Sequence, residues 1–185
     1  MLKREQCNLR PIDEQDLETI LKWRNSERVR ANMYTDHIIS MAEHKNWFER
    51  YKLQEKARYL LFEIDGRAVG LVYFTDLDEA NEKAYWGFYL GETDVPKGSG
   101  TAMGFLGLDY AFNVLKLRKL CGEAFAFNEA SRRFHAKLGF YEEGRFCKHV
   151  LKGGEYEDVV SFALFRDQWL TNLPALSSFA FKEHQ

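Results

Sequence analysis

The sequence predicts one α/β (α+β) domain built on a mixed, mostly antiparallel sheet with helices on both faces. Apolar residues first recur at helical spacing, then alternate as in strands, and finally mix the two periods. Tight-turn residues join the early strands, whereas helical segments join the later ones. With 185 residues, 45% of them hydrophobic, the chain is long and apolar enough to bury one core.

The N-terminal part predicts a strand followed by two helices. Residues 7–12 form a short opening strand, and Asp13 is placed to cap a helix that runs to residue 24. Ser40 and Glu43 have the spacing of a capping box, which marks the start of a second helix. Four side chains share one face of that helix: His44, Trp47, Phe48 and Tyr51.

Three strands come next, at residues 59–65, 68–76 and 83–90. They are rich in the aromatic and β-branched residues that strands favour. Asp65-Gly66 lies between the first two and is typical of a two-residue hairpin turn. We therefore expect these strands to be antiparallel neighbours.

Helices and strands alternate after residue 100. A helix over 101–116 precedes a strand over 119–127. A shorter helix within 128–140 ends at Gly139, a residue suited to the left-handed position after a helix.

The chain closes with a hairpin whose turn is Gly153-Gly154. Residues beyond Trp169 show little pattern. We therefore expect a single domain over residues 1–170 and a C-terminal tail over 171–185.

Composition argues against several classes of protein. There are 26 basic and 28 acidic residues, a formal net charge of −2, which gives no reason to expect binding to nucleic acid or to an anionic membrane. Three scattered cysteines, Cys7, Cys121 and Cys147, predict neither a disulfide framework nor a metal site. The sequence has no apolar run of membrane-spanning length and no signal-peptide core, so we expect a cytoplasmic protein.

A glycine-rich stretch, VPKGSGTAMG at 95–104, lies between a strand and a helix. Helix N-termini offer free N–H groups and partial positive charge to phosphates, and small residues let a ligand approach the backbone. The stretch matches neither G-x-x-x-x-G-K-S/T nor a complete G-x-G-x-x-G, because Met103 occupies the third glycine position. Taken alone, it indicates either a phosphate site or a tight turn capped by glycines.

Two motifs together resemble the GNAT superfamily of N-acetyltransferases. Residues 97–102, KGSGTA, resemble its Q/R-x-x-G-x-G/A signature, with lysine in place of glutamine or arginine. Residues 128–140, NEASRRFHAKLGF, resemble its second motif, in which a strand ends in asparagine and a helix closes with K-L-G-F. The resemblance covers about residues 8–168 and implies a splayed strand pair in the sheet.

The resemblance implies acetyl-CoA as the acetyl donor, with no metal. Backbone N–H groups of the loop would hold the pyrophosphate, and pantetheine would lie between two separated strands. Gly87 is expected at a bulge in the first of these strands. The implied cofactor-binding residues are Tyr89, Leu90, Lys97, Gly98, Ser99, Gly100, Thr101, Ala102, Asn128 and Ser131.

His135 stands where the superfamily usually has a tyrosine that is thought to protonate the leaving thiolate. It shares a helix face with Asn128 and Ser131. Histidine can act as a general acid, so His135 is a catalytic candidate. The alternative is a contact with the cofactor or a structural role.

The N-terminal half resembles, more narrowly, the N-acetyltransferases of pseudaminic acid biosynthesis. W-R-N at 23–25 and the H-x-x-W pattern of the second helix carry this resemblance. It implies transfer to the 4-amino group of a UDP-linked 4-amino-4,6-dideoxy-N-acetyl-altrosamine, used in surface glycans such as those of flagellin. The implied substrate-binding residues are Arg24, His44, Trp47, Thr75 and Tyr89, although helix packing also explains His44, Trp47 and Arg24.

The base that deprotonates the amine is left open among His44, Glu43 and ordered water. Ribosomal-protein N-terminal and polyamine acetyltransferases share the L-R-P opening and are the enzyme alternative. A polyamine site needs carboxylates, which Glu43, Asp76, Asp78, Glu79 and Glu82 could supply. A non-catalytic acyl-CoA-binding module is the alternative outside the enzymes, and we expect a monomer or homodimer.

Overall fold

A computed structural model of the chain describes residues 2–182, which form a seven-stranded sheet with the order β1-β2-β3-β4-β5-β7-β6. All neighbouring strands are antiparallel except β4 and β5, which are parallel. The strands are β1 (Cys7–Pro11), β2 (Arg58–Ile64), β3 (Arg67–Asp78), β4 (Lys83–Leu90), β5 (Lys119–Phe125), β6 (Tyr141–Lys152) and β7 (Glu155–Phe165). The helices are α1 (Leu17–Asn25), α2 (Glu27–Arg30), α3 (Met41–Lys52), α4 (Ser99–Asp109), α5 (Glu129–Lys137) and α6 (Arg166–Ala180).

Three of the local signals in the sequence are confirmed. Asp65 and Gly66 both have positive φ, 50° and 79°, as the predicted hairpin turn requires. Gly153 and Gly154 do the same at the second hairpin, with φ of 59° and 91°. The capping box at the start of α3 is formed in full.

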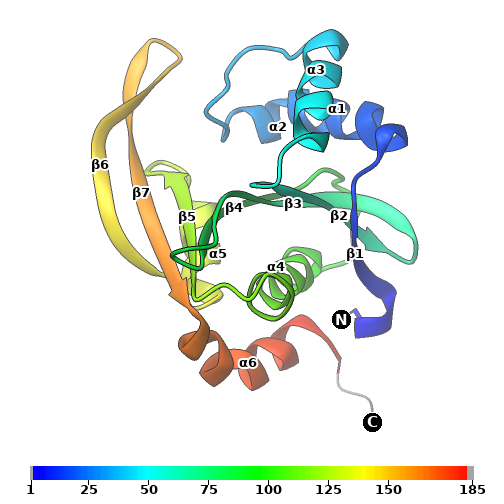
Figure 1. Cartoon of the computed structure of the whole chain (residues 1–185), viewed down its shortest axis with the longest axis vertical. Coiled ribbons are helices and arrows are strands. Elements are labelled where there is room, and N and C mark those ends of the chain that lie inside the picture. The colour runs from blue at the N-terminus through cyan, green and yellow to red at the C-terminus, as the bar shows by residue number, and fades with distance from the viewer. Residues whose placement is uncertain (1, 183–185) are drawn as a thin grey trace.

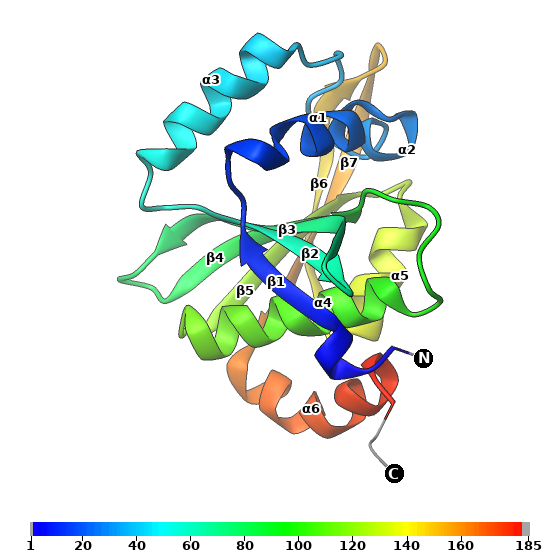
Figure 2. The same ribbon diagram turned by 90° about the vertical axis from the view of Figure 1, so that its right-hand side faces the viewer.

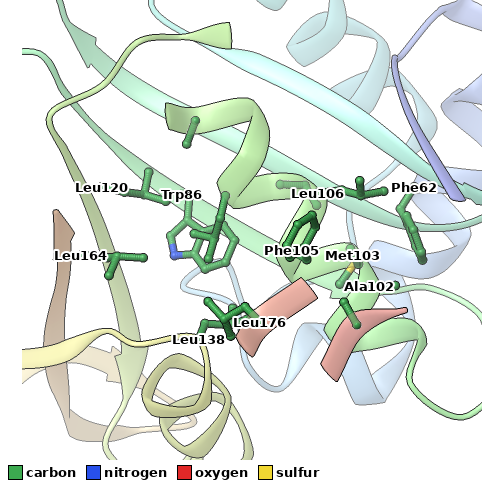
Figure 3. Close-up of a cluster of buried hydrophobic side chains, with 14 of the residues drawn as sticks. Phe62, Trp86, Ala102, Met103, Phe105, Leu106, Leu120, Leu138, Leu164 and Leu176 are labelled. Carbon is green, nitrogen blue, oxygen red and sulfur yellow. The ribbon is translucent and has the colours of Figure 1, made fainter. Parts of the chain in front are cut away.

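Helices cover both faces of the sheet, as predicted. Figure 2 shows α1, α2 and α3 on one face and α4 and α6 on the other. Side chains along β3 alternate between the two faces of the sheet and so contribute to both hydrophobic clusters. Leu71 faces the α1–α3 side, whereas Val72 and Phe74 face the larger cluster under α4. In Figure 3, Phe105 and Leu106 of α4 gather with Trp86 of β4 and side chains of neighbouring elements in that larger cluster.

The parallel pair β4–β5 separates after a short contact. Pairing joins Lys83–Trp86 to Lys119–Gly122 and ends there. The rest of β4, from Gly87 to Leu90, still pairs with β3 on its other side but leaves its β5-facing edge open. This is the predicted splayed strand pair.

Gly87 does not sit at a bulge, so that expectation is wrong. The β3–β4 register is continuous through Tyr73 opposite Gly87, and the irregularity lies between Thr75 and Asp78. The glycine is needed for another reason. A Cβ at position 87 would lie 2.1 Å from the ring of Tyr73, which therefore packs directly on the backbone there.

The segment predicted as an unpatterned tail is mostly helical. Helix α6 runs across residue 170 to Ala180 and packs along α4 (Figure 2). The sequence pattern does not predict this helix, because Pro174 lies in its interior and proline removes one backbone hydrogen bond. Residues 183–185 of the predicted tail lie outside the described residues, and the domain boundary at 170 stays a prediction.

No helix within residues 2–182 has the length and apolar character needed to cross a membrane.

We expect α6 to be part of the folding unit. Trp169 is fully buried against Phe105 of α4 and Phe112 of the turn that follows α4. Replacing it, Trp169→Ala, should lower the free energy of unfolding by about 3–5 kcal/mol because it leaves a large cavity. Urea denaturation measures this change. The control is Leu170→Ala, one residue on, where the side chain is 52% exposed; equal stability of the two variants would contradict the prediction.

Candidate active site

A cavity of about 1040 Å³ lies where β4 and β5 separate. Its walls include the unpaired part of β4, residues 123–124 of β5, and side chains from α1, α3, α4 and α5. The structure thus brings the two sequence motifs and the N-terminal helices to one place. The predicted site residues that line this cavity are Arg24, His44, Trp47, Thr75, Tyr89, Leu90, Gly100, Asn128, Ser131 and His135.

The first turn of α4 provides free backbone donors. Gly98 precedes the helix with φ of 98°, a left-handed conformation that favours glycine. Among the described residues, the N–H groups of Gly98, Gly100 and Thr101 have no protein acceptor. A Cβ on Gly100 would meet only Leu90, at 3.8 Å, so the space beside it is open. Lys97 is exposed and adds a positive charge next to this turn.

The side chains of other residues in the predicted loop are turned away from the cavity. Ser99 is 1% exposed, and both its N–H and its hydroxyl donate to the carbonyl of Pro96. Ala102 is buried in the core, and its N–H donates to the carbonyl of Gly98. Thr101 accepts a hydrogen bond from Lys137 Nζ at 2.9 Å. The prediction that Ser99 and Ala102 contact the cofactor therefore lacks geometric support.

Asn128 and Ser131 line the cavity from the start of α5. The side chain of Asn128 caps this helix by accepting a hydrogen bond from the N–H of Ser131 at 3.0 Å. Both residues thus combine a place at the cavity with a local structural role.

The surroundings of His135 make it a poor general acid. Its side chain is 2% exposed and stacks on Phe162 with ring centres 4.5 Å apart. Nδ1 donates to the carbonyl of Ser131 at 2.9 Å, so Nε2 of the neutral ring carries no proton. Burial lowers the pKa of His135 to about 4. At neutral pH the ring is therefore uncharged and has no proton to give to a thiolate, which favours the alternative of a packed or cofactor-contacting residue.

Position 122 explains how His135 packs so close to the sheet. A Cβ on Gly122 would lie 2.8 Å from His135 Nε2 and 2.9 Å from Trp86 Nε1. Neither nitrogen has a hydrogen-bond partner among the described residues. Gly122 is the last residue of β5 that pairs with β4. Because it has no side chain, the rings of His135 and Trp86 can both pack where the two strands separate.

His44 is also neutral at pH 7, so it would not contact the substrate as a charged donor. It is 5% exposed and stacks on Trp47, with ring centres 5.0 Å apart. Its pKa is lowered, first by burial and then by the nearby charge of Arg24, although a backbone hydrogen bond with Leu17 opposes the shift. Nε2 has no partner among the described residues, so His44 is suited to accept a proton. Its catalytic role stays a prediction.

Arg24 brings a positive charge into the cavity without a carboxylate to balance it. Its Nη1 is buried and has no partner within the described part of the chain, and Nη2 makes only a 3.4 Å contact with the carbonyl of Thr35. Burial lowers the pKa of the guanidinium, next to the phenols of Tyr89 and Tyr73, yet arginine stays protonated at neutral pH. A half-buried guanidinium without a carboxylate partner has the charge and the free N–H donors to bind an anionic group.

Sequence reasoning missed Tyr34, Tyr73 and Glu123, which also line the cavity. Tyr34 lies between α2 and α3, where no periodic pattern points to it. Glu123 is the one charged residue inside β5 after Lys119, its first residue, and this exception in an otherwise apolar strand is the sequence feature that indicates it. Among residues 2–182, no cluster of three or more His, Cys, Asp or Glu side chains is placed to hold a metal ion.

Comparison with protein families agrees with the two motifs. The model of the acetyltransferase (GNAT) domain matches residues 6–141. The chain belongs to the GNAT acetyltransferase family. It is an acetyl-CoA-dependent N-acetyltransferase.

Several relatives cover most of this acetyltransferase. Spermidine N(1)-acetyltransferase of Escherichia coli K12 is 25% identical over 162 residues, 88% of this chain and 87% of that protein. An uncharacterized N-acetyltransferase of Bacillus subtilis, YokL, is 30% identical over 171 residues, 91% and 94% of the two chains. The crystal structure of spermidine N-acetyltransferase from Vibrio cholerae in complex with CoA and spermine superposes with a TM-score of 0.84 at 20% identity, covering 90% and 99%.

The narrower resemblance to the pseudaminic acid enzymes is not confirmed. Acetyltransferase PseH of Campylobacter jejuni is 24% identical over 145 residues, 77% of this chain and 89% of PseH. It matches a smaller share of this chain than the spermidine enzyme of Escherichia coli does. The acceptor amine is therefore a separate question from the family.

The residues at the cavity fit acetyl-CoA. The free N–H groups of α4 suit its phosphates, and the open edge of β4 beyond Trp86 offers backbone donors and acceptors to an amide-bearing chain. Acetyl-CoA supplies a thioester that an amine attacks directly. The chain's own residues contribute binding, orientation and exclusion of water.

We expect Gly100→Val to impair binding of acetyl-CoA while leaving the fold intact. The added side chain has room in the structure but fills the approach to the free N–H groups. The KM for acetyl-CoA should rise about tenfold or more, with an unchanged Tm. Steady-state kinetics at saturating acceptor measures this, and Gly144→Val on the exposed strand β6 is the control. A KM equal to that of the wild type would contradict the backbone site.

His135 should make stability depend on pH. Its pKa is about 4 in the folded chain against an ordinary 6.5. Protonation therefore favours the unfolded chain, and stability that is present above the ordinary pKa is lost as the pH falls toward the folded one. The loss amounts to about 3 kcal/mol, measurable by urea denaturation at several pH values.

The variant His135→Phe should lose this part of the pH dependence, while His149→Phe, which removes an exposed histidine, should keep it. With substrates saturating, kcat of His135→Phe should fall by less than about tenfold, since general acid catalysis contributes more than that. A larger fall in kcat with intact stability would restore His135 as the acid.

Proposed function

We propose that the acceptor amine belongs to a small molecule that also carries a negative charge. The observation that carries this proposal is the unpaired, half-buried guanidinium of Arg24 in the cavity. A UDP-linked 4-amino-4,6-dideoxy sugar, the substrate implied by the pseudaminic acid resemblance, is an acceptor of this kind. Its diphosphate suits bidentate hydrogen bonds from arginine, and its base can stack on aromatic side chains such as Trp47.

A polyamine is the second candidate, and the relatives favour it. The spermidine acetyltransferases of Escherichia coli and Vibrio cholerae match more of this chain than PseH does. A polyamine needs carboxylates around it. Glu43 lines the cavity, but its oxygens are engaged by the N–H of Ser40 and by His37. Asp76 and Glu123 are the other carboxylates of the lining, whereas Asp78, which the sequence had offered, is not part of it.

The candidates differ in the sign of charge that the site has to hold, so one experiment separates them. Thiol release from acetyl-CoA is measured with the UDP-4-amino-sugar, spermidine and an N-terminal peptide side by side. Turnover of the nucleotide sugar supports the main proposal. Turnover of spermidine alone, or of the peptide alone, would overturn it and leave the N-acetyltransferase activity in place.

Arg24→Met sharpens the comparison. For an anionic acceptor we expect its KM to rise about tenfold or more, because the half-buried cation proposed to bind it is gone. For a polyamine the same change removes a repulsive charge, and KM should stay the same or fall. The KM for acetyl-CoA is the internal reference. Lys22→Met, an exposed charge loss on the same helix, is the control.

The expectation of a monomer or homodimer stays a prediction. One similar structure, a spermidine N-acetyltransferase from Vibrio cholerae with a TM-score of 0.78, is described as dodecameric. The oligomeric state of this acetyltransferase is therefore best measured together with its acceptor preference, by light scattering with and without acceptor.

A further inference from the structure

A hydrogen bond joins the N-terminal helical layer to the sheet inside the cavity. The phenol of Tyr34, in the connection between α2 and α3, donates to Glu123 Oε2 at 2.5 Å. Tyr34 and Glu123 are 89 positions apart in the chain, and both line the cavity. Tyr34 stays a donor, since burial and the adjacent carboxylate raise its pKa.

Glu123 occupies a defined position relative to the acetyl donor. It directly follows Gly122, the last residue of β5 that pairs with β4. The phosphate site of α4 lies beyond the other end of the open edge, past Leu90. A donor held at α4 and extended along Gly87–Leu90 spans about 13 Å at strand spacing. Its reactive end therefore reaches the point where the strands meet, next to Glu123.

The carboxylate of Glu123 has one oxygen to spare. Oε2 is occupied by Tyr34, whereas Oε1 accepts no hydrogen bond from the described residues. Glu43 is occupied by Ser40 and His37, and Asp76 is exposed. Glu123 is thus a partly buried carboxylate of the cavity lining that has a free acceptor beside the expected thioester. An amine that arrives as an ammonium ion is attracted to such an oxygen.

Lys152 holds the segment that carries Tyr34. It lies at the end of β6, and its side chain is 11% exposed. Nζ contacts the carbonyl of Met33 at 2.9 Å, the carbonyl of Arg30 at 3.4 Å and Asp36 Oδ1 at 3.2 Å. Figure 1 shows the β6–β7 hairpin rising beside the connection between α2 and α3. The lysine therefore ties that connection to the hairpin on both sides of Tyr34.

Phe125 links the two contacts. The Tyr34 ring packs edge-on against Phe125 with centres 5.4 Å apart, and Lys152 Nζ lies 5.5 Å from the centre of the same ring. Phe125 is buried on β5, two residues after Glu123. Three contacts therefore fix Tyr34. Its ring packs on Phe125, Lys152 binds the chain on either side of it, and its hydroxyl donates to Glu123.

We propose that Glu123 binds the acceptor's ammonium group at the thioester end of the cavity, and that Lys152 is a positioning residue that holds Glu123 in place through Tyr34. This inference rests on the N-acetyltransferase activity and on no particular acceptor. Any amine substrate has to bring its nitrogen to the same point. Failure of the nucleotide-sugar proposal therefore leaves it untouched.

The first test is Glu123→Gln, which keeps the shape and removes the charge. With whichever acceptor is turned over, kcat/KM for the acceptor should fall about tenfold or more, while the KM for acetyl-CoA changes less than twofold. Glu18→Gln, an exposed carboxylate on α1, is the control. An acceptor kcat/KM within threefold of the wild type would overturn the assignment of Glu123.

The second test addresses Lys152. Lys152→Met should lower the acceptor kcat/KM in the same direction, and Lys152→Arg should restore most of it. In combination with Tyr34→Phe, which keeps the ring on Phe125, the loss should be less than the sum of the single effects, because both act through the same carboxylate. Additive losses, or equal losses in Lys152→Met and Lys152→Arg, would show a merely structural lysine and overturn its positioning role.

A third measurement needs no acceptor. Amide hydrogen exchange over residues 31–39 should be faster in Lys152→Met than in the wild type and near the wild-type rate in Lys152→Arg. Lys45→Met, an exposed lysine on α3, is the control. Unchanged exchange in Lys152→Met would show that the lysine does not hold the Tyr34 segment. If Lys152→Met does not fold, Tyr34→Phe carries the kinetic test of the Glu123 contact by itself.

Discussion

The site depends on the separation of two parallel strands. Once β4 and β5 part after Trp86 and Gly122, the backbone groups along one edge of β4 have lost their neighbour. Such groups need partners, and a ligand with amides of its own can supply them. The same separation opens the cavity and faces it with the first turn of α4. Cofactor binding and acceptor binding are therefore two consequences of one feature of the sheet.

The charge that acts in the cavity comes from groups nearby, because acidic and basic residues nearly balance over the whole chain. The formal net charge is −2, so no overall field draws in an anion or a cation. Instead, N–H groups at α4 suit phosphates, and Arg24 offers a half-buried positive charge. Glu123 sets a negative charge where the strands meet, held by Tyr34. An amine acceptor with an anionic part would use the last two together.

Much of the fold was predictable because its signals are local. The turn at Asp65-Gly66 and the capping box of Ser40 and Glu43 depend only on neighbouring residues, and both are formed. Helix α6 was missed because its stability comes from burial of Trp169 against α4, which outweighs the interior Pro174. Gly87 shows the same limit. The glycine was noticed, but only the structure reveals that it makes room for the ring of Tyr73.

The sequence by itself determined the family, the acetyl donor and the glycine-rich loop that we expect to face the phosphates, because these follow from short motifs with their own backbone geometry. It also identified a set of side chains that the fold brings to one cavity. The tertiary structure decided what those side chains can do. Burial makes His135 and His44 neutral, and a buried Nη1 without a partner among the described residues is why we propose Arg24 as an anion site. The contact between Tyr34 and Glu123 joins residues far apart in the chain, and no local pattern encodes such a contact. The protonation state of a side chain and its hydrogen-bond partners depend on its surroundings in three dimensions. These surroundings are set only when the sheet and both helical layers have assembled.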